Sequence, residues 1–442
     1  MRILLVEPWQ TGSHLAWAEG YRASSGHEVD IVGLPGELWR WRLRGGALPL
    51  AEKITAWIDS NGQPDLLLIS GLVDVAEMLG LARRNLSPDV GVVIYQHESQ
   101  LVYPVAEGNY DNGAALRNWM SWCVADLVLF NSYHHMRSVA EALPGFVGGL
   151  PDRSHEPMLE NVFGKFEVFP VGVDLRGIPE REPLPPPTSH PSSLRFLEAA
   201  AADPADDPAD DPAPDLGIAD GVGVGVGVAD GVDGADAVEA AGAEVVRSID
   251  AGSRGRPVIL WPHRWERDKD PAAFVAALRK VRDAGLDFGL VLAGQDPPSG
   301  STIAEDERAA AEKEFSEHIV ASGEFDRADY LDYVAQCDLV VSCAKHEFFG
   351  VAVVEAVASG CVPLLPNALS YPELIRPPWH SMTLYEPGTF GTRLVDAVKR
   401  IDQLRDEAVG LPQTMRRFDW ATMAKVYDDR IAAVSARLTA AA

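Results

Sequence analysis

Short, unbroken runs of apolar residues recur along the chain, and segments with apolar residues at helical spacing separate them. The runs occupy residues 2–7, 28–34, 65–70, 90–97, 126–131 and 166–171 in the first half, and 257–262, 289–295, 338–343, 362–366 and 382–385 in the second. Unbroken runs, unlike alternating ones, are typical of parallel strands that helices cover on both faces. The pattern predicts an α/β protein with two doubly wound halves, whose ligands bind at the carboxyl ends of the strands.

The pattern breaks between the two halves. Residues 183–193 are rich in Pro and Ser, and the stretch that follows consists mainly of Ala, Asp, Gly and Val. Such a composition buries too little apolar surface to offset the entropy of ordering. We therefore predict an N-terminal domain over 1–182, a low-complexity, acidic and flexible insertion over 183–250, a C-terminal domain over 251–400, and helices over 401–442 that pack back on the N-terminal domain.

The chain is acidic, with a formal net charge of −27. Residues 198–246 contain 13 Asp and Glu side chains and no Lys or Arg, which leaves −14 for the rest of the chain. This balance disfavours a general nucleic-acid binder, so any contact with nucleic acid has to be a local patch. Adaptation to a high-salt cytoplasm would explain the acidic composition without any functional role.

The first residues, MRILLVEPW, lack a basic leader segment, and no apolar stretch is long enough to span a membrane. These features predict a cytoplasmic protein. The four cysteines have neither a disulfide pattern nor metal-ligand spacing. We expect reduced, mostly buried thiols and no structural zinc.

Two glutamates, Glu347 and Glu355, flank the expected start of a helix near Gly350. Free backbone N–H groups and the helix dipole make such a helix start a binding site for a diphosphate. Glu347 would then reach the sugar beyond the diphosphate, and Glu355 would accept from ribose hydroxyls. The spacing alone favours a plainer interpretation, in which both glutamates cap or solvate the helix.

The stretch EFFGVAVVE resembles the E-x7-E motif of family-4 glycosyltransferases, whose GT-B fold has two Rossmann-like domains facing a cleft. Further motifs resemble one branch, the glycosyltransferase-like domain-containing protein 1 or tRNA-queuosine alpha-mannosyltransferase family. They are LWRWR (38–42), YQHESQLVYP (95–104), VADLVLFNS (124–132), WPHRWERDKDP (261–271), AKHEFFGVAVVEAVASGCVPLLP (344–366) and YPEL (371–374). The motifs cover both halves, whereas the insertion has no counterpart in the family pattern.

The resemblance implies a nucleotide-sugar site in which fixed cations neutralise the departing diphosphate. Its expected catalytic residues are Glu347, His97, Arg264 and Lys269. Its expected nucleotide-sugar contacts are Gly12, Ser13, Arg264, Lys269, Glu347, Phe348, Phe349, Gly350, Val351 and Glu355. Two alternatives stay open: a solvated loop that pairs Arg264 and Lys269 with Glu266 and Asp268, and an ordinary strand–helix turn at Gly12.

Residues 38–46 hold three arginines and two tryptophans. Arginine binds phosphate with two parallel hydrogen bonds and tryptophan stacks on bases, so this is the best local patch for a nucleic-acid acceptor. An amphipathic segment with both tryptophans buried is an equal alternative. The expected acceptor contacts are Trp39, Arg40, Trp41, Arg42, His14, Glu98 and Gln100.

No DxD motif of the metal-dependent GT-A class directly follows a strand, so no metal or cofactor is expected. From the resemblance we expect a retaining glycosyltransferase that moves mannose from GDP-mannose to queuosine in tRNA. The alternatives are a family-4 transferase with a lipid or small-molecule acceptor, and a non-catalytic GT-B binding module. The sequence does not predict the oligomeric state.

Overall fold

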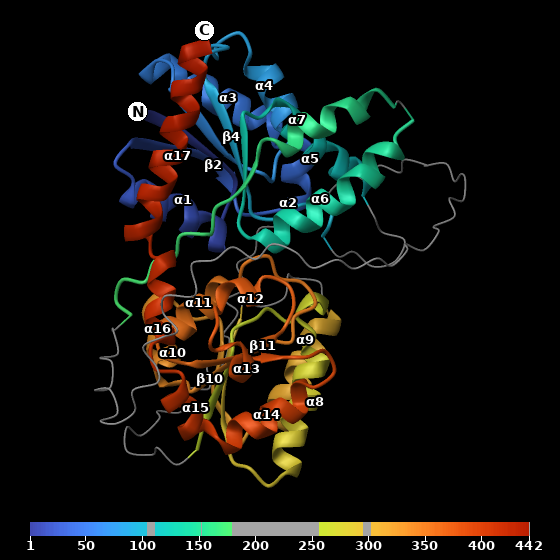
Figure 1. Ribbon diagram of the computed structural model, residues 1–442, viewed down its shortest axis with the longest axis vertical. Coiled ribbons are helices and arrows are strands. Elements are labelled where there is room, and N and C mark those ends of the chain that lie inside the picture. The colour runs from blue at the N-terminus through green and yellow to red at the C-terminus, as the bar shows by residue number, and fades with distance from the viewer. Residues whose placement is uncertain (104–110, 152, 179–255, 295–301, 442) are drawn as a thin grey trace, which may run out of the picture. The chain divides into compact units, whose positions relative to one another are not determined.

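The two sets of apolar runs form two sheets. The computed structural model describes residues 1–103, 111–151, 153–178, 256–294 and 302–441. Within these residues each sheet has six strands, and every strand pair is parallel (Figure 1). The predicted α/β architecture is thereby confirmed. We refer to the described residues up to 178 as the N-terminal half and to those from 256 as the C-terminal half.

The sheet of the N-terminal half has the order β2-β1-β3-β4-β5-β6. Its strands are β1 (Arg2–Gln10), β2 (Glu28–Pro35), β3 (Leu66–Ser70), β4 (Gly91–Gln96), β5 (Leu127–Phe130) and β6 (Phe166–Val168). The helices of this half are α1 (Gly12–Ser24), α2 (Trp39–Gly45), α3 (Ala47–Asn61), α4 (Val75–Ala82), α5 (Asn112–Val124), α6 (Tyr133–Gly148), the 3₁₀ turn η1 (Arg153–Met158) and α7 (Leu159–Phe163).

The sheet of the C-terminal half has the order β12-β11-β10-β7-β8-β9. Its strands are β7 (Val258–Trp261), β8 (Gly289–Ala293), β9 (Ile319–Gly323), β10 (Leu339–Val341), β11 (Val362–Pro366) and β12 (Leu384–Tyr385). The helices here are η2 (Arg267–Lys269), α8 (Pro271–Asp283), α9 (Thr302–Glu314), α10 (Arg327–Gln336), α11 (Val351–Ala358), α12 (Tyr371–Leu374), α13 (His380–Thr383), α14 (Phe390–Lys399), α15 (Ile401–Glu407), α16 (Leu411–Thr414), η3 (Met415–Phe418) and α17 (Trp420–Ala441).

Burial on both faces of the first sheet explains its unbroken apolar runs. Successive side chains of a strand point to opposite faces. Leu4 of β1 belongs to a core formed with α3 and α5, whereas its neighbour Leu5 belongs to a core formed with α1 and α17. Each face therefore needs apolar residues, and the strand cannot alternate with polar ones.

The structure corrects the predicted strands at two places. β9 was not predicted, because only Ile319, Val320 and Ala321 give it apolar character and it lies at the edge of the sheet. In the predicted run 382–385, only Leu384 and Tyr385 form a strand, since the two preceding residues end helix α13. The predicted insertion over 183–250 lies outside the described residues.

The last helix of the chain packs on the N-terminal half, where Figure 1 shows α17 beside α1. Asp428 of α17 accepts from Tyr21 Oη at 2.8 Å and from Ser25 Oγ at 2.6 Å. The helices before it, α16 and η3, pack on α11 of the C-terminal half. All described residues thus fall in one compact unit, Met1–Glu182 with Glu244–Ala442.

The cysteines agree with the sequence prediction: all four are free thiols, with Cys123 half-buried and the other three buried. In the part of the chain that the structure describes, no helix is both long and apolar enough to cross a membrane.

Candidate active site

The loop between β10 and α11 brings the E-x7-E stretch to the carboxyl edge of the second sheet. Gly350 caps α11 with a φ of 101°, a left-handed conformation that favours glycine. A Cβ at this position would lie 3.2 Å from Leu374 Cδ1. Ser370 Oγ donates to the carbonyls of Glu347 and Phe349 at 3.3 and 3.0 Å. These contacts fix the loop that leads into the predicted helix start.

Glu347 and Lys269 form an ion pair beside this helix start. Lys269 Nζ lies 3.2 Å from Glu347 Oε2, and the Phe349 N–H donates to Glu347 Oε1 at 3.2 Å. Burial opposes ionisation of Glu347, but Lys269, His263 and the Phe349 N–H outweigh it and lower the pKa of Glu347. The same pairing raises the pKa of Lys269 against its burial. Both side chains are therefore charged at neutral pH.

The basic loop after β7 makes the acidic contacts that the alternative of a solvated loop predicted. Lys269 Nζ lies 3.1 Å from Asp268 Oδ2, and Arg264 Nη2 lies 3.3 Å from Glu266 Oε2. Burial lowers the pKa of Arg264, but Glu266 and Tyr103 raise it above its ordinary value. Each cation thus has an acidic neighbour that an anionic ligand has to compete with.

Glu355 pairs with an arginine that the sequence analysis missed. Its Oε1 accepts from Arg327 Nη1 at 2.5 Å, and Arg327 Nη2 donates to the Asp174 carbonyl at 2.8 Å. Burial raises the pKa of Glu355, and Arg327 only partly offsets this. Arg327 is the first residue of α10, the helix that follows β9. Prediction of β9 would therefore have placed Arg327 at the carboxyl edge of the second sheet.

The aromatic side chains of the motif are packing residues. Phe348 is buried and stacks on His135, with ring centroids 3.7 Å apart. Phe349 is also buried, and its ring meets the Phe418 ring edge-on, with ring centroids 5.3 Å apart. Val351, the first residue of α11, is half-buried. These residues would reach a ligand through their backbone N–H groups, whereas the sequence analysis expected contacts without distinguishing backbone from side chain.

The predicted glycine loop of the N-terminal half starts helix α1. Gly12 has a φ of 51°, and no atom lies within 4 Å of the position of an added Cβ. Gly12 and Ser13 are exposed, while His14, one residue further, is buried. The open surroundings of Gly12 suit the close approach of a ligand to the backbone.

His14 and His97 lie together beside Glu7, a residue that the sequence analysis did not place in the site. His14 Nδ1 is 3.1 Å from Glu7 Oε1, and the His14 and His97 ring centroids are 4.2 Å apart. Burial lowers the pKa of His97 far below its ordinary value, and the nearby His14 lowers it further. The signal for Glu7 was a charged residue at the end of the first apolar run.

Glu98 and Gln100 extend this group. Gln100 Nε2 donates to Glu98 Oε1 at 3.2 Å, and the Gln100 N–H donates to Asn118 Oδ1 at 2.8 Å. Burial raises the pKa of Glu98, while the charges of His14 and Arg264 act in the opposite direction. Glu98 thus interacts electrostatically with residues of both halves.

Direct contacts also join the two halves near these residues. The rings of Tyr103 and His346 lie 5.0 Å apart. Glu373 accepts from the Tyr133 and His134 N–H groups at 2.7 and 2.6 Å, at the start of α6. A carboxylate suits that helix end because of its free N–H groups and its dipole.

Helix α2 carries the predicted acceptor patch. The Trp41 side chain is 59% exposed, which excludes the alternative in which both tryptophans are buried. Arg40 lies over the Trp39 ring at 5.1 Å, and Arg42 donates to the Pro35 carbonyl. The patch therefore presents one exposed indole and the Arg40 cation at the surface.

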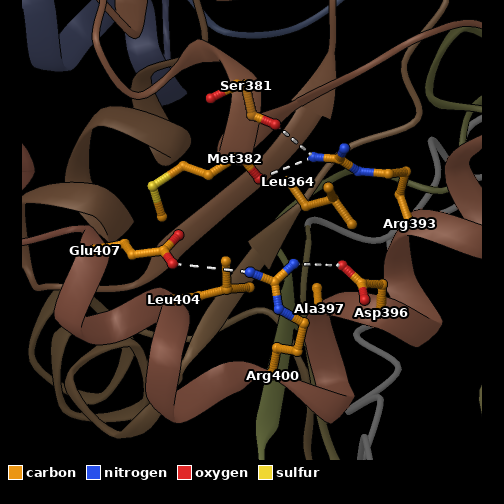
Figure 2. A pocket seen from close by; sticks show the side chains of 9 residues that line it. All are labelled: Leu364, Ser381, Met382, Arg393, Asp396, Ala397, Arg400, Leu404 and Glu407. Carbon is orange, nitrogen blue, oxygen red and sulfur yellow. Dashed lines mark hydrogen bonds and ion pairs between the residues drawn. The ribbon is translucent and has the colours of Figure 1, made fainter.

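A cavity of about 190 Å³ lies elsewhere in the C-terminal half, among β11, α13, α14 and α15 (Figure 2). Arg393 Nη2 donates to the Ser381 and Met382 carbonyls at 3.0 and 3.1 Å. Arg400 pairs with Asp396 and Glu407. The nine residues that line the cavity include none of the predicted site residues. Figure 2 shows that Arg393 and Arg400 both bind other residues of the lining.

Comparison with known structures identifies the fold. HepE of Anabaena, solved in complex with UDP, aligns with a TM-score of 0.60 at 15% identity, over 98% of this chain and 100% of that one. Sucrose-phosphate synthase from Thermosynechococcus elongatus aligns with a TM-score of 0.61 at 15% identity, over 100% of both chains. The fold is GT-B, as predicted.

Sequence comparisons relate the chain to known glycosyltransferases. The model of the tRNA-queuosine alpha-mannosyltransferase N-terminal domain matches residues 2–173, and that of the group 1 glycosyl transferases matches residues 247–406. The tRNA-queuosine alpha-mannosyltransferase of Drosophila melanogaster is 28% identical over 377 residues, 84% of this chain and 81% of the relative. This chain is a glycosyltransferase, and its N-terminal half is similar to the N-terminal domain of the tRNA-queuosine alpha-mannosyltransferases.

Proposed function

We propose that the protein transfers mannose from GDP-mannose to the cyclopentenediol of queuosine in tRNA, with retention at the anomeric carbon. The observation that carries this proposal is the Glu347–Lys269 ion pair beside the Gly350 helix start. The name of the Drosophila relative supports mannose and queuosine. The proposal places the protein in the cytoplasm.

The donor diphosphate would bind where the site is most positive. Lys269, Arg264 and the first N–H groups of α11 would hold it, and it would displace Asp268 and Glu266 from the two cations. The same groups stabilise the charge that grows on the diphosphate as its bond to the sugar breaks. These cations make a metal ion on the diphosphate unnecessary.

The remaining groups orient the two substrates. Glu347 would accept hydrogen bonds from the sugar hydroxyls. Glu355 would accept hydrogen bonds from the ribose hydroxyls as well as from Arg327. As the anomeric carbon leaves the phosphate oxygen and bonds to the acceptor oxygen, the acceptor proton passes to the departing phosphate. His97 would contact the sugar, while His14, Glu98 and Gln100 would contact the acceptor.

Helix α2 is the proposed contact for the tRNA. Trp41 is exposed, and Arg40, its neighbour in the chain, lies over the Trp39 ring, so an unpaired base can stack on Trp41 while the cation meets a phosphate. The same exposed indole also suits a lipid surface, which is the alternative acceptor class.

The deciding experiment measures transfer of radiolabelled mannose from GDP-mannose to tRNA. Wild type should label queuosine-containing tRNA but not queuosine-free tRNA, and Glu347→Gln should abolish labelling. Glu386→Gln, at an exposed glutamate of the same half, is the matched control. Binding or hydrolysis of GDP-mannose without labelled tRNA would reject queuosine as the acceptor. Cosedimentation with liposomes but not with tRNA would then favour a lipid.

A further inference from the structure

Three side chains from three separate elements of the N-terminal half converge on one point. They are Glu7 near the end of β1, His14 in the first turn of α1, and His97 directly after β4. Each offers one donor atom, and the three donor atoms all lie within 4.8 Å of one another. Donor atoms around a tetrahedral zinc ion are about 3.4 Å apart, so a small shift of the side chains suffices to surround one.

Two of these side chains have a buried polar atom without a partner. Glu7 is fully buried, and its Oε1 accepts from the Trp9 N–H at 2.9 Å and faces His14 Nδ1 at 3.1 Å. Its Oε2 is buried without a hydrogen-bond partner, and so is His97 Nε2. An unmatched buried carboxylate oxygen is costly, so two such atoms in one cluster call for a bound group.

We propose that Glu7, His14 and His97 form a binding site for a divalent first-row transition-metal ion, with Zn²⁺ the best fit. Two imidazoles and a carboxylate are donors that suit zinc, whereas Mg²⁺ and Ca²⁺ prefer oxygen ligands alone. Neighbouring groups hold the ligands in place: the Trp9 N–H binds Glu7, and Asn131 Nδ2 donates to the His97 carbonyl at 2.9 Å.

The proposed ion is independent of the diphosphate. The expectation of a metal-free enzyme rested on the missing DxD motif of the metal-dependent GT-A class, and Arg264 and Lys269 meet the charge of the donor from the other half. Three protein ligands leave one tetrahedral position open, so a sugar or acceptor hydroxyl can contact His97 and His14 through the ion instead of directly. The site rests on its own geometry, so its test does not depend on the proposed transfer reaction.

The test is metal content, measured on the full-length chain without an affinity tag. The protein is loaded with Zn²⁺, dialysed against metal-free buffer and analysed for zinc by mass spectrometry. Wild type should retain one equivalent per chain. Glu7→Gln and His97→Gln should each weaken Zn²⁺ binding by more than about 10–100-fold, the loss typical of an outer-shell partner alone.

Matched controls separate a built site from surface binding. Glu19→Gln, at a half-buried glutamate of α1 outside the cluster, and His27→Gln, at a histidine outside the cluster, should retain zinc like wild type. Circular dichroism checks that each variant is folded. Zn²⁺ should also raise the unfolding temperature of wild type but not of the cluster variants. Absence of retained zinc in wild type, or equal retention by folded Glu7→Gln and His97→Gln, would overturn the proposal.

Discussion

The Glu347–Lys269 ion pair of the C-terminal half and the Glu7–His14–His97 cluster of the N-terminal half differ in how their charges are matched. Lys269, in the loop after β7, and Glu347, in the loop before α11, contact each other directly. In the cluster, three elements contribute one residue each, and two buried atoms have no partner. The first region can fold around its own charges, whereas the second is complete only with a further group.

The largest effect should come from breaking the Glu347–Lys269 ion pair. Lys269→Met should lower the rate of mannose transfer by about 10²–10³-fold, because one preorganised positive charge on the departing diphosphate is lost. Radiolabel incorporation at saturating donor measures this. Lys313→Met, at an exposed lysine of α9, is the matched control.

A double variant separates the role of the ion pair in chemistry from its role in folding. Lys269→Met leaves Glu347 charged and unpaired, which should also lower stability. Adding Glu347→Gln should restore much of that stability without restoring transfer. Recovery of transfer in the double variant would mean that the ion pair is only structural.

The next largest effect is a difference in stability between alanine variants of two glycines, one from each half. Gly350→Ala combines a φ of 101° with a Leu374 atom 3.2 Å from the new Cβ, and should cost about 2–3 kcal/mol in the free energy of unfolding. Gly12→Ala meets no atom within 4 Å and should cost only about 1 kcal/mol. Urea unfolding measures both. Equal losses would show that packing around Gly350 adds nothing to the backbone strain.

A smaller effect concerns pH and His263. Burial, and then the neighbouring Lys269, lowers the pKa of His263 from 6.5 to about 4. Between these values the unfolded chain binds a proton that the folded chain does not, so acidification across this window destabilises the fold. His263→Gln should remove about 2 kcal/mol of that loss, measured as the change in unfolding free energy between pH 6.5 and 4.5. An unchanged pH slope would mean that the folded protein accommodates the imidazolium.

The smallest effect should appear at α2. Trp41→Ala should raise the KM for tRNA by about fivefold, the equivalent of about 1 kcal/mol of base stacking, with kcat unchanged. Leu48→Ala, at an exposed apolar residue of α3, should leave KM unaltered. A fall in kcat at constant KM would place Trp41 outside the tRNA contact.

Glu347 and Lys269 were each predictable from their own neighbours in the chain. Each lies in a separate strand–loop–helix stretch, which local patterns reveal. Strand order is set by long-range pairing, which local patterns do not encode. For that reason Glu7 was not connected with His97, although both lie near the carboxyl ends of predicted strands. Arg327 was missed because β9 has too few apolar residues to stand out.

The return of α17 to the N-terminal half has a consequence for cutting the chain. Val173 and Asp419 pair side by side, and α17 binds α1 through Asp428. Two separate polypeptides, one ending and the other beginning within residues 183–250, would therefore each carry part of a ready-made binding surface for the other. The protein is thus a natural candidate for a split reporter, in which sugar transfer reports that two fused partners have met.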